Sequence, residues 1–220
     1  MHIDKPIYLD FDETLTPYQS AKGLVKLAGK EAEMRSKVIY HNLMGECERS
    51  IEESSSADKM VAQVESSLKK YLQEGAGLLR GVAVSRLDEI YCPPSKEFFD
   101  ISKICKDKEI VISTYTDERI PEKFIERNKE YIPPNCRVVG SRLEADADGL
   151  LTGRLEKIAS KTQCYSGGDV VVNGQSDLPL CKKAHESGYD IYVVEERSQF
   201  LKKALEKFKI PSMPANMMGK

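Results

Sequence analysis

The 220-residue sequence lacks the patterns that mark several large classes of proteins. No apolar run approaches the length that spans a bilayer, and the N-terminus enters a predicted strand almost at once, without a signal-peptide pattern. A run of one charge is also missing: the formal net charge is -2, and basic residues alternate with acidic ones along the chain. We therefore expect a cytoplasmic protein that binds neither membranes nor nucleic acid.

Cysteine and histidine occur, but their spacing is not that of a metal site. The six cysteines include no Cys-x-x-Cys pair, which argues against structural zinc, and we interpret them as reduced thiols. The three histidines are isolated, so each is expected to be a packed or surface side chain. Neither a zinc centre nor a histidine base is expected.

What the sequence does contain is an alternation of short apolar runs with amphipathic stretches, which is typical of a Rossmann-like parallel sheet with helices on both faces, an α/β fold. A tail at 211–220, with two prolines and three methionines, is expected to be unpacked. The predicted strands are 7–9, 109–113, 137–141, 169–173 and 191–194, and the main predicted helices are 21–27, 31–43, 60–72, 98–104, 155–163, 178–187 and 198–207.

A long helical excursion separates the first predicted strand from the second. Gly29 divides its first two helices, and Gly45 is expected to end the second of them. The pattern of strands and helices resumes after Pro93-Pro94. We predict that residues 1–17 and 88–220 form the α/β core and that residues 18–87 form an inserted helical cap subdomain.

Two carboxylates, Asp10 and Asp12, follow the first predicted strand at the point where it leaves the core. Buried charge raises the free energy of the fold unless it is paired or bound to a metal, so such a pair suggests a site. The alternative is a solvated turn in which Asp12 or Thr14 caps a following helix. The local sequence favours neither interpretation over the other.

Polar side chains also follow two other predicted strands. Ser113 and Thr114 come after one of them, and Asn173 and Asp177 come after the other. Each alone is as well explained by a turn or a helix cap. Because the carboxyl ends of parallel strands meet at one edge of the sheet, their joint occurrence predicts a functional site there.

These motifs resemble those of the haloacid dehalogenase superfamily, and within it the phosphoserine phosphatase-like branch. Residues 10–14, Asp-Phe-Asp-Glu-Thr, match the family's first motif, Asp-x-Asp-x-Thr after an apolar strand. Ser113 matches the second motif, and residues 172–177 match the fourth in part. Residues 148–153 and the helical insert are similar to the same branch, so the resemblance covers nearly the whole chain.

The resemblance implies a Mg²⁺-dependent phosphatase that acts on a small phosphorylated metabolite. It implies that Asp10 is the nucleophile, which forms an aspartyl-phosphate, and that Asp12 is first the general acid and then the base. It implies Mg²⁺ bound by the Asp10 carboxylate, the Asp12 backbone carbonyl and groups of Asn173 and Asp177.

The resemblance also implies two groups that hold the phosphoryl oxygens. One is Ser113, and the other is a lysine, the family's third motif. Lys157 is the choice by spacing, with Arg154 and Lys161 as alternatives.

Three positions depart from the family's pattern. Asn173 stands where the family has a metal-binding Asp, so weaker Mg²⁺ binding is expected. Gln19 stands where phosphoserine phosphatases have a cap glutamate, and Thr114-Tyr115 replaces a Gly-Gly pair, so a phosphate ester other than phosphoserine is favoured. Two alternatives stay open: a catalytically degenerate protein that binds a ligand or regulates a partner, and a phosphotransferase that uses the same intermediate. The sequence makes no prediction about oligomeric state.

Overall fold

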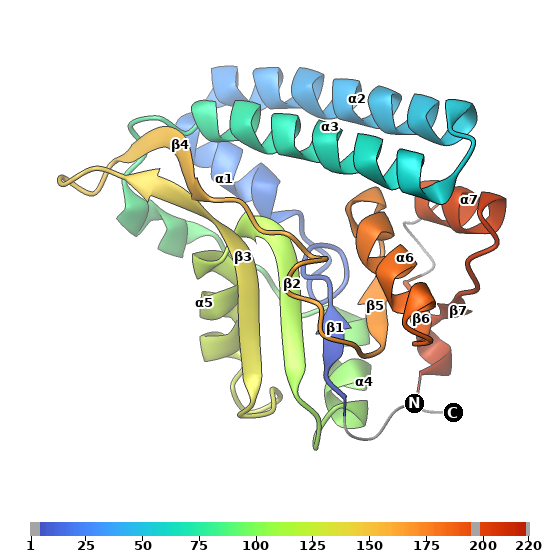
Figure 1. The fold of residues 1–220 in the computed structure, drawn as a ribbon. Coiled ribbons are helices and arrows are strands. Elements are labelled where there is room, and N and C mark those ends of the chain that lie inside the picture. Colours follow the sequence, from blue (N-terminus) through green and yellow to red (C-terminus); the bar gives the residue numbers. More distant parts are fainter. Residues whose placement is uncertain (1–4, 195–198, 219–220) are drawn as a thin grey trace.

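A mainly parallel sheet forms the centre of the protein in the computed structural model, which describes residues 5–194 and 199–218. The seven strands of this sheet lie in the order β4-β3-β2-β1-β5-β6-β7, and only β4 runs antiparallel to its neighbour (Figure 1). The α/β fold predicted from the sequence is therefore confirmed. The strands are β1 Ile7–Leu9, β2 Ile110–Asp117, β3 Cys136–Ala145, β4 Leu151–Lys157, β5 Val170–Val172, β6 Ile191–Val193 and β7 Met213–Pro214.

The central strands are apolar because both of their faces are covered. Ile7 and Leu9 point into one apolar cluster, with residues of α4 (Lys96–Ile104) and α5 (Arg119–Arg127). Tyr8, between them, points into a second cluster, with residues of α6 (Leu178–Glu186) and α7 (Gln199–Lys207). The alternation of side chains along one strand thus places two helices on each face.

The register of the three central strands brings their carboxyl ends together. Leu9, the last residue of β1, lies beside Ile112 of β2 and Val171 of β5. The residues after Leu9, Ile112 and Val172 therefore lie at the same edge of the sheet, where the sequence predicted a site. The strand β2 itself continues to Asp117, past its predicted end at Ser113, because Ser113 still pairs with Val139 of β3.

Three helices lie across this edge: α1 (Ser20–Ala28), α2 (Lys30–Glu53) and α3 (Ala57–Gly77) (Figure 1). The helices α2 and α3 pack against each other through an apolar stripe that includes Leu43, Cys47, Met60 and Val64. After α3 the chain passes through the 3-10 helix η1 (Val84–Glu89), and the backbone of this connection is bonded to β4, with Gly81 N–H donating to the Leu151 carbonyl at 2.8 Å.

Three local predictions are wrong. The helix α2 does not end at Gly45, because burial of Leu43 and Cys47 against α3 outweighs the roughly 1 kcal/mol that a glycine costs inside a helix. The segment 155–163 is not a helix: its start belongs to β4, where Leu155 pairs with Leu143 of β3.

The third concerns the tail, which forms β7 and the 3-10 helix η4 (Ala215–Met217) and buries Met218. It is therefore packed against the sheet. The last helix begins at Gln199 as described here, and Ser198, where its start was predicted, lies outside the described residues.

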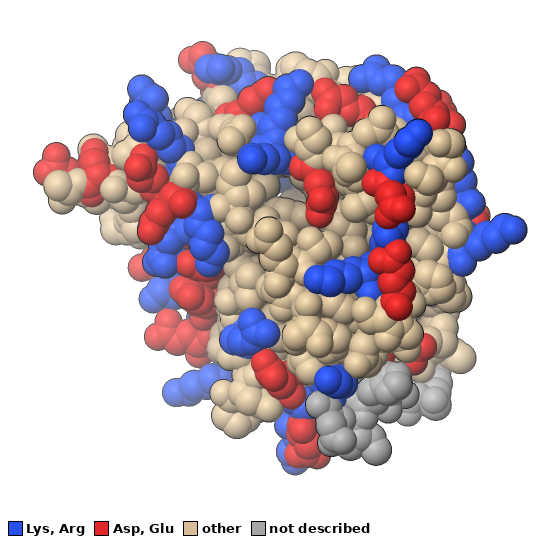
Figure 2. Space-filling view, in the orientation of Figure 1, with Lys and Arg blue, Asp and Glu red and all other residues tan. Residues whose placement is uncertain are grey.

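Charged side chains of both signs are interspersed on the face of the molecule that Figure 2 shows. This arrangement agrees with the alternation of charges along the sequence. Of the helices within 5–194 and 199–218, none combines the length and the apolar character needed to cross a membrane.

Candidate active site

Asp10 and Asp12 lie on the loop that leaves β1. The backbone N–H of Asp10 donates to the Val171 carbonyl of β5 at 2.9 Å, so this residue is still fixed to the sheet. The chain then turns sharply: Leu15 N–H donates to the Phe11 carbonyl at 3.0 Å, and Glu13 has a positive φ of 59°. The turn keeps the Asp10 side chain buried and places Asp12 beside the start of α1.

Lys161 joins Asp10 to Asp177. Its Nζ atom lies 2.5 Å from Asp10 Oδ1 and 2.5 Å from Asp177 Oδ1, and the lysine side chain is only 1% exposed. Burial alone would lower the pKa of Lys161, but the two carboxylates raise it above its ordinary value, so the ammonium stays charged. Burial and the charge of Asp177 raise the pKa of Asp10 to about 8, and Lys161 opposes this rise.

Asp177 also holds the loop after β5. Its Oδ2 atom accepts from the backbone N–H groups of Asn173 and Gly174, at 3.3 and 3.0 Å. Its two oxygens thus fix Lys161 on one side and the loop on the other. In this structure the carboxylate of Asp177, which the resemblance assigns to the metal, pairs with Lys161 and with the backbone of this loop.

Asp12 is held by Ser20 at the start of α1. Its Oδ1 accepts from Ser20 N–H at 2.6 Å and its Oδ2 accepts from Ser20 Oγ at 2.8 Å, and Ser20 Oγ also contacts Thr116 Oγ1 at 2.7 Å. Burial raises the pKa of Asp12 to about 6, although the Ser20 hydrogen bonds lower it. Asp12 can therefore hold or release a proton near neutral pH.

Ser113 is buried at the end of the apolar part of β2. Its Oγ lies 3.6 Å from Sγ of Cys164, and this thiol donates to the Lys161 carbonyl at 3.2 Å. Cys164 thus connects the serine to the segment that carries the lysine. Sequence reasoning missed Cys164, Ser20 and Thr116, and for Cys164 no local pattern pointed to the site.

The segment 161–169 lies along β1, from Asp10 at its carboxyl end to Pro6 at its amino end. The Ser166 N–H donates to the Tyr8 hydroxyl at 2.9 Å, and the Tyr8 hydroxyl donates to the Cys164 carbonyl at 3.2 Å. Gly168 has a φ of 149°, and a Cβ there would lie 1.9 Å from the Pro6 carbonyl oxygen. Only glycine permits this approach of the segment to the start of β1.

The structure does not bring Lys157 to the carboxylates. It lies on β4, its side chain is 48% exposed, and its Nζ pairs with Oε2 of Glu118 at 2.7 Å. Arg154, also on β4, is exposed. The structure therefore places Lys157 away from the carboxylates, and it places Lys161, one of the two alternatives, against Asp10 and Asp177.

Comparison with known proteins adds to this geometry. No family model matches the sequence, and no curated protein matches it. Solved structures do match, among them a phosphoserine phosphatase in apo form, with 16% identity and a TM-score of 0.65, covering 96% of this chain and 94% of that one. A substrate-bound phosphoserine phosphatase complex is 18% identical, with a TM-score of 0.63 and coverage of 97% and 94%.

A third structure, a phospho-aspartyl intermediate analogue of phosphoserine phosphatase, is 18% identical, with a TM-score of 0.61 and coverage of 92% and 98%. The chain has the same fold as these phosphoserine phosphatase structures. The likeness extends over both the sheet and the helices above it, since coverage is above nine tenths in both directions. At these identities it is a likeness of fold.

At this edge of the sheet, oxygen ligands suited to Mg²⁺ lie beside Lys161. They are the Asp10 carboxylate, the Asp12 backbone carbonyl and the Asn173 amide, whose Nδ2 donates to the Asp12 carbonyl at 3.1 Å. A half-turn of this amide would present its oxygen instead. Among the described residues no group of three or more His, Cys, Asp or Glu side chains could hold a metal ion, so the set depends on a backbone carbonyl and an amide. By ligand type it fits a hard cation.

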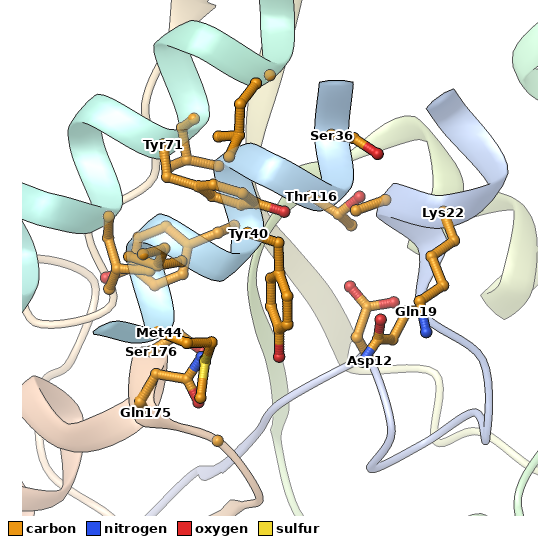
Figure 3. A pocket seen from close by; sticks show the side chains of 18 of the residues that line it. Asp12, Gln19, Lys22, Ser36, Tyr40, Met44, Tyr71, Thr116, Gln175 and Ser176 are labelled. Carbon is orange, nitrogen blue, oxygen red and sulfur yellow. The ribbon is translucent and has the colours of Figure 1, made fainter. Parts of the chain in front are cut away.

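A cavity of about 1030 Å³ opens between this edge of the sheet and the helices α1 to α3. Asp10, Asp12, Lys161 and Asn173 line this cavity together with side chains of α1, α2 and α3. Figure 3 shows Asp12 below Ser36 and Tyr71, which come from α2 and α3. The acidic pair therefore faces a cavity large enough for a small molecule.

Proposed function

We propose that this protein is a phosphatase that hydrolyses small phosphate monoesters through an aspartyl-phosphate on Asp10. The observation that most supports this proposal is the buried contact of Lys161 with both Asp10 and Asp177, beside a second acid, Asp12, at the floor of a cavity. A carboxylate held against a fixed cation is positioned to attack a phosphoryl group, whose charge the same cation offsets.

In the first step an oxygen of Asp10 attacks phosphorus, and the bond from phosphorus to the ester oxygen breaks. That oxygen takes a proton from Asp12 and leaves as the alcohol. The pKa of Asp12, raised by burial to about 6, makes a proton available for this transfer near neutral pH.

In the second step water attacks the aspartyl-phosphate. Asp12, now ionised, takes a proton from the water, and the bond between phosphorus and Asp10 breaks to release inorganic phosphate. Ser20 holds Asp12 through both steps with two hydrogen bonds. The same residue thus serves first as acid and then as base.

Lys161 and Ser113 are the groups we assign to the phosphoryl oxygens. The ammonium of Lys161 supplies the positive charge, and the buried Ser113 hydroxyl supplies a hydrogen bond once it turns from Cys164. Lys157 is not part of this assignment.

Bound Mg²⁺ would supply the further positive charge that keeps Asp10 ionised and offsets the charge of the substrate phosphate. Asp10, the Asp12 carbonyl and Asn173 would hold it. The prediction that Asp177 is a fourth ligand stays a prediction, and both of its oxygens already accept bonds from Lys161 and from backbone N–H groups.

We further propose that residues 18–87 act as the cap of this site. Their helices line the walls of the cavity above Asp12, where they can select the alcohol part of the substrate. Exclusion of bulk water by such a cap would strengthen the contacts of Lys161 with the phosphoryl group.

The test is hydrolysis of a generic aryl phosphate with Mg²⁺ by the wild-type protein and by Asp10→Asn. We expect turnover that falls about a thousandfold or more in Asp10→Asn, and an acid-quenched phosphoryl adduct on the peptide that contains Asp10. Asp107→Asn, at an exposed position, is the matched control and should keep full activity. Absence of turnover with a broad panel of phosphate esters would instead favour a binding protein.

A further inference from the structure

The cavity extends well beyond the space above Asp10 that a phosphoryl group would occupy. Its volume of about 1030 Å³ lies at the upper end of the roughly 300–1,000 Å³ typical of sites for drug-sized ligands. From its lining we infer that the alcohol released from the substrate contains an aromatic ring. This inference rests on the proposed function and specifies its substrate class.

Three tyrosines line the cavity around the site. Tyr40 comes from α2, Tyr71 from α3 and Tyr115 from β2. The rings of Tyr40 and Tyr71 lie 6.3 Å apart at 64° to each other, and the ring of Tyr115 lies 5.3 Å from Nζ of Lys161. Aromatic surface is thus present both next to the phosphoryl position and on the wall above it.

The side chain of Tyr40 is the most exposed of the three tyrosines. Its side chain is 41% exposed although it points into the cavity, and Figure 3 shows it projecting from α2 beside Asp12. An exposed tyrosine ring next to the general acid offers a flat apolar face to the group that leaves. A second ring placed there would gain an offset or edge-to-face contact that a short alkyl chain cannot make.

The position of Tyr40 is fixed by groups from the sheet side. The side chain of Gln175 contacts its hydroxyl, and Nε2 of the same glutamine lies 3.0 Å from Sδ of Met44 one turn along α2. Tyr40 therefore does not need to fold back against the protein to satisfy its hydroxyl. Its ring remains available for a ligand.

Another part of the cavity lining is polar. Gln19, Lys22 and Ser36 lie there (Figure 3). Polar substituents on a ring can accept hydrogen bonds from these three side chains.

The experiment compares three alkyl phosphates whose leaving groups differ little in acidity: 2-phenylethyl, 2-cyclohexylethyl and propyl phosphate. We expect kcat/KM for the phenyl ester to exceed that for the propyl ester about tenfold or more and to exceed that for the cyclohexyl ester severalfold. Equal values for phenyl and propyl esters, or for phenyl and cyclohexyl esters, would overturn the inference.

Variants of Tyr40 test whether this preference for the phenyl ester comes from the cavity. Tyr40→Leu should lower the ratio of kcat/KM for the phenyl ester to kcat/KM for the propyl ester severalfold, whereas Tyr40→Phe should leave this ratio unchanged. Tyr91→Leu, at an exposed tyrosine outside the cavity lining, is the matched control and should also keep it. A ratio unchanged in Tyr40→Leu would overturn the role of this ring.

If the proposed phosphatase function is wrong, the aromatic site can still be tested by ligand binding. If none of the three esters is hydrolysed, their binding to the wild-type protein is measured by calorimetry. Tighter binding of the phenyl ester than of the propyl and cyclohexyl esters would then support the aromatic site without phosphatase activity. Equal binding of the three, or none, would overturn the inference as well.

Discussion

The side-chain amide of Asn173 donates a hydrogen bond of 3.1 Å to the backbone carbonyl of Asp12. This bond joins the loop after β5 to the loop after β1 at the point where we place the metal. An amide there supplies no negative charge, so the site relies on Asp10 for its only carboxylate, as long as Asp177 remains paired with Lys161.

We therefore expect Asn173→Asp to bind Mg²⁺ more tightly. A second carboxylate should lower the Mg²⁺ concentration at half-maximal activity by about tenfold, because each unit of ligand charge strengthens the binding of a hard cation. The measurement is the initial rate against Mg²⁺ concentration, with Asn128→Asp as a control at an amide outside the cavity. If both variants behave as wild type, Asn173 does not contact the metal.

Substitution of Lys161 should affect stability and activity much more than substitution of Lys157. Lys161→Met leaves Asp10 and Asp177 buried without their cation and should lower the free energy of unfolding by about 3–5 kcal/mol. Lys157→Met removes a half-exposed ion pair with Glu118 and should lower the free energy of unfolding by only about 0–1 kcal/mol. Urea unfolding and the rate of phosphate ester hydrolysis measure both effects. A larger loss in Lys157→Met would contradict the assignment of Lys161.

Cys164 should affect activity because its thiol contacts both Ser113 and the Lys161 carbonyl. Cys164→Ala removes the thiol that contacts both, and we expect kcat/KM to fall by about fivefold, the equivalent of one hydrogen bond of about 1 kcal/mol. Cys164→Ser keeps a donor and an acceptor and should restore most of the activity. Cys136→Ala, at the far end of β3, serves as a control, and an equal loss there would indicate a general packing effect.

The pairing of α2 with α3 should depend on pH through Glu46. Its hydrogen bond from Ser67 at 2.7 Å lowers the pKa of Glu46, and the Lys70 pair at 3.3 Å acts in the same direction. A lowered folded-state pKa means that the stabilisation is present above the ordinary value of 4.5 and disappears as the pH falls through the folded-state value. The substitution Glu46→Gln should thus lower the free energy of unfolding by about 0.5–1 kcal/mol at neutral pH and leave it unchanged in acid.

Urea unfolding of wild type and Glu46→Gln across this acidic range measures the difference. Glu65→Gln, at an exposed position of α3, is the control and should show no such pH-dependent difference. A difference between wild type and Glu46→Gln that stays constant with pH would show that the charge of Glu46 is not responsible.

Those features that depend on a few neighbouring residues were predictable. The apolar runs of β1, β2 and β5 determine buried strands, and the polar residues directly after them, Asp10, Ser113 and Asn173, must then emerge at one edge of the sheet. The helical character of residues 18–87 likewise follows from the spacing of apolar residues, which places Met60, Val64 and Leu68 on one face of α3.

Other features depend on pairing between distant segments, and the local sequence is ambiguous there. Lys157 and Lys161 are separated by four residues, so a helix over 155–163 would have put them on the same face, but pairing of Leu155 with Leu143 makes the first part of this segment a strand. The chain leaves the sheet after Lys157, so Lys157 pairs with Glu118 at the end of β4 and Lys161 lies against Asp10.

Thus the sequence by itself determined the acids, their order and the type of fold, because strand ends are set by local patterns of apolar and polar residues. Only the tertiary structure decided which cation lies against Asp10 and which rings line the cavity. These depend on the register of β4 against β3 and on the packing of α2 and α3 above the sheet, and both are set by contacts between residues far apart in the chain.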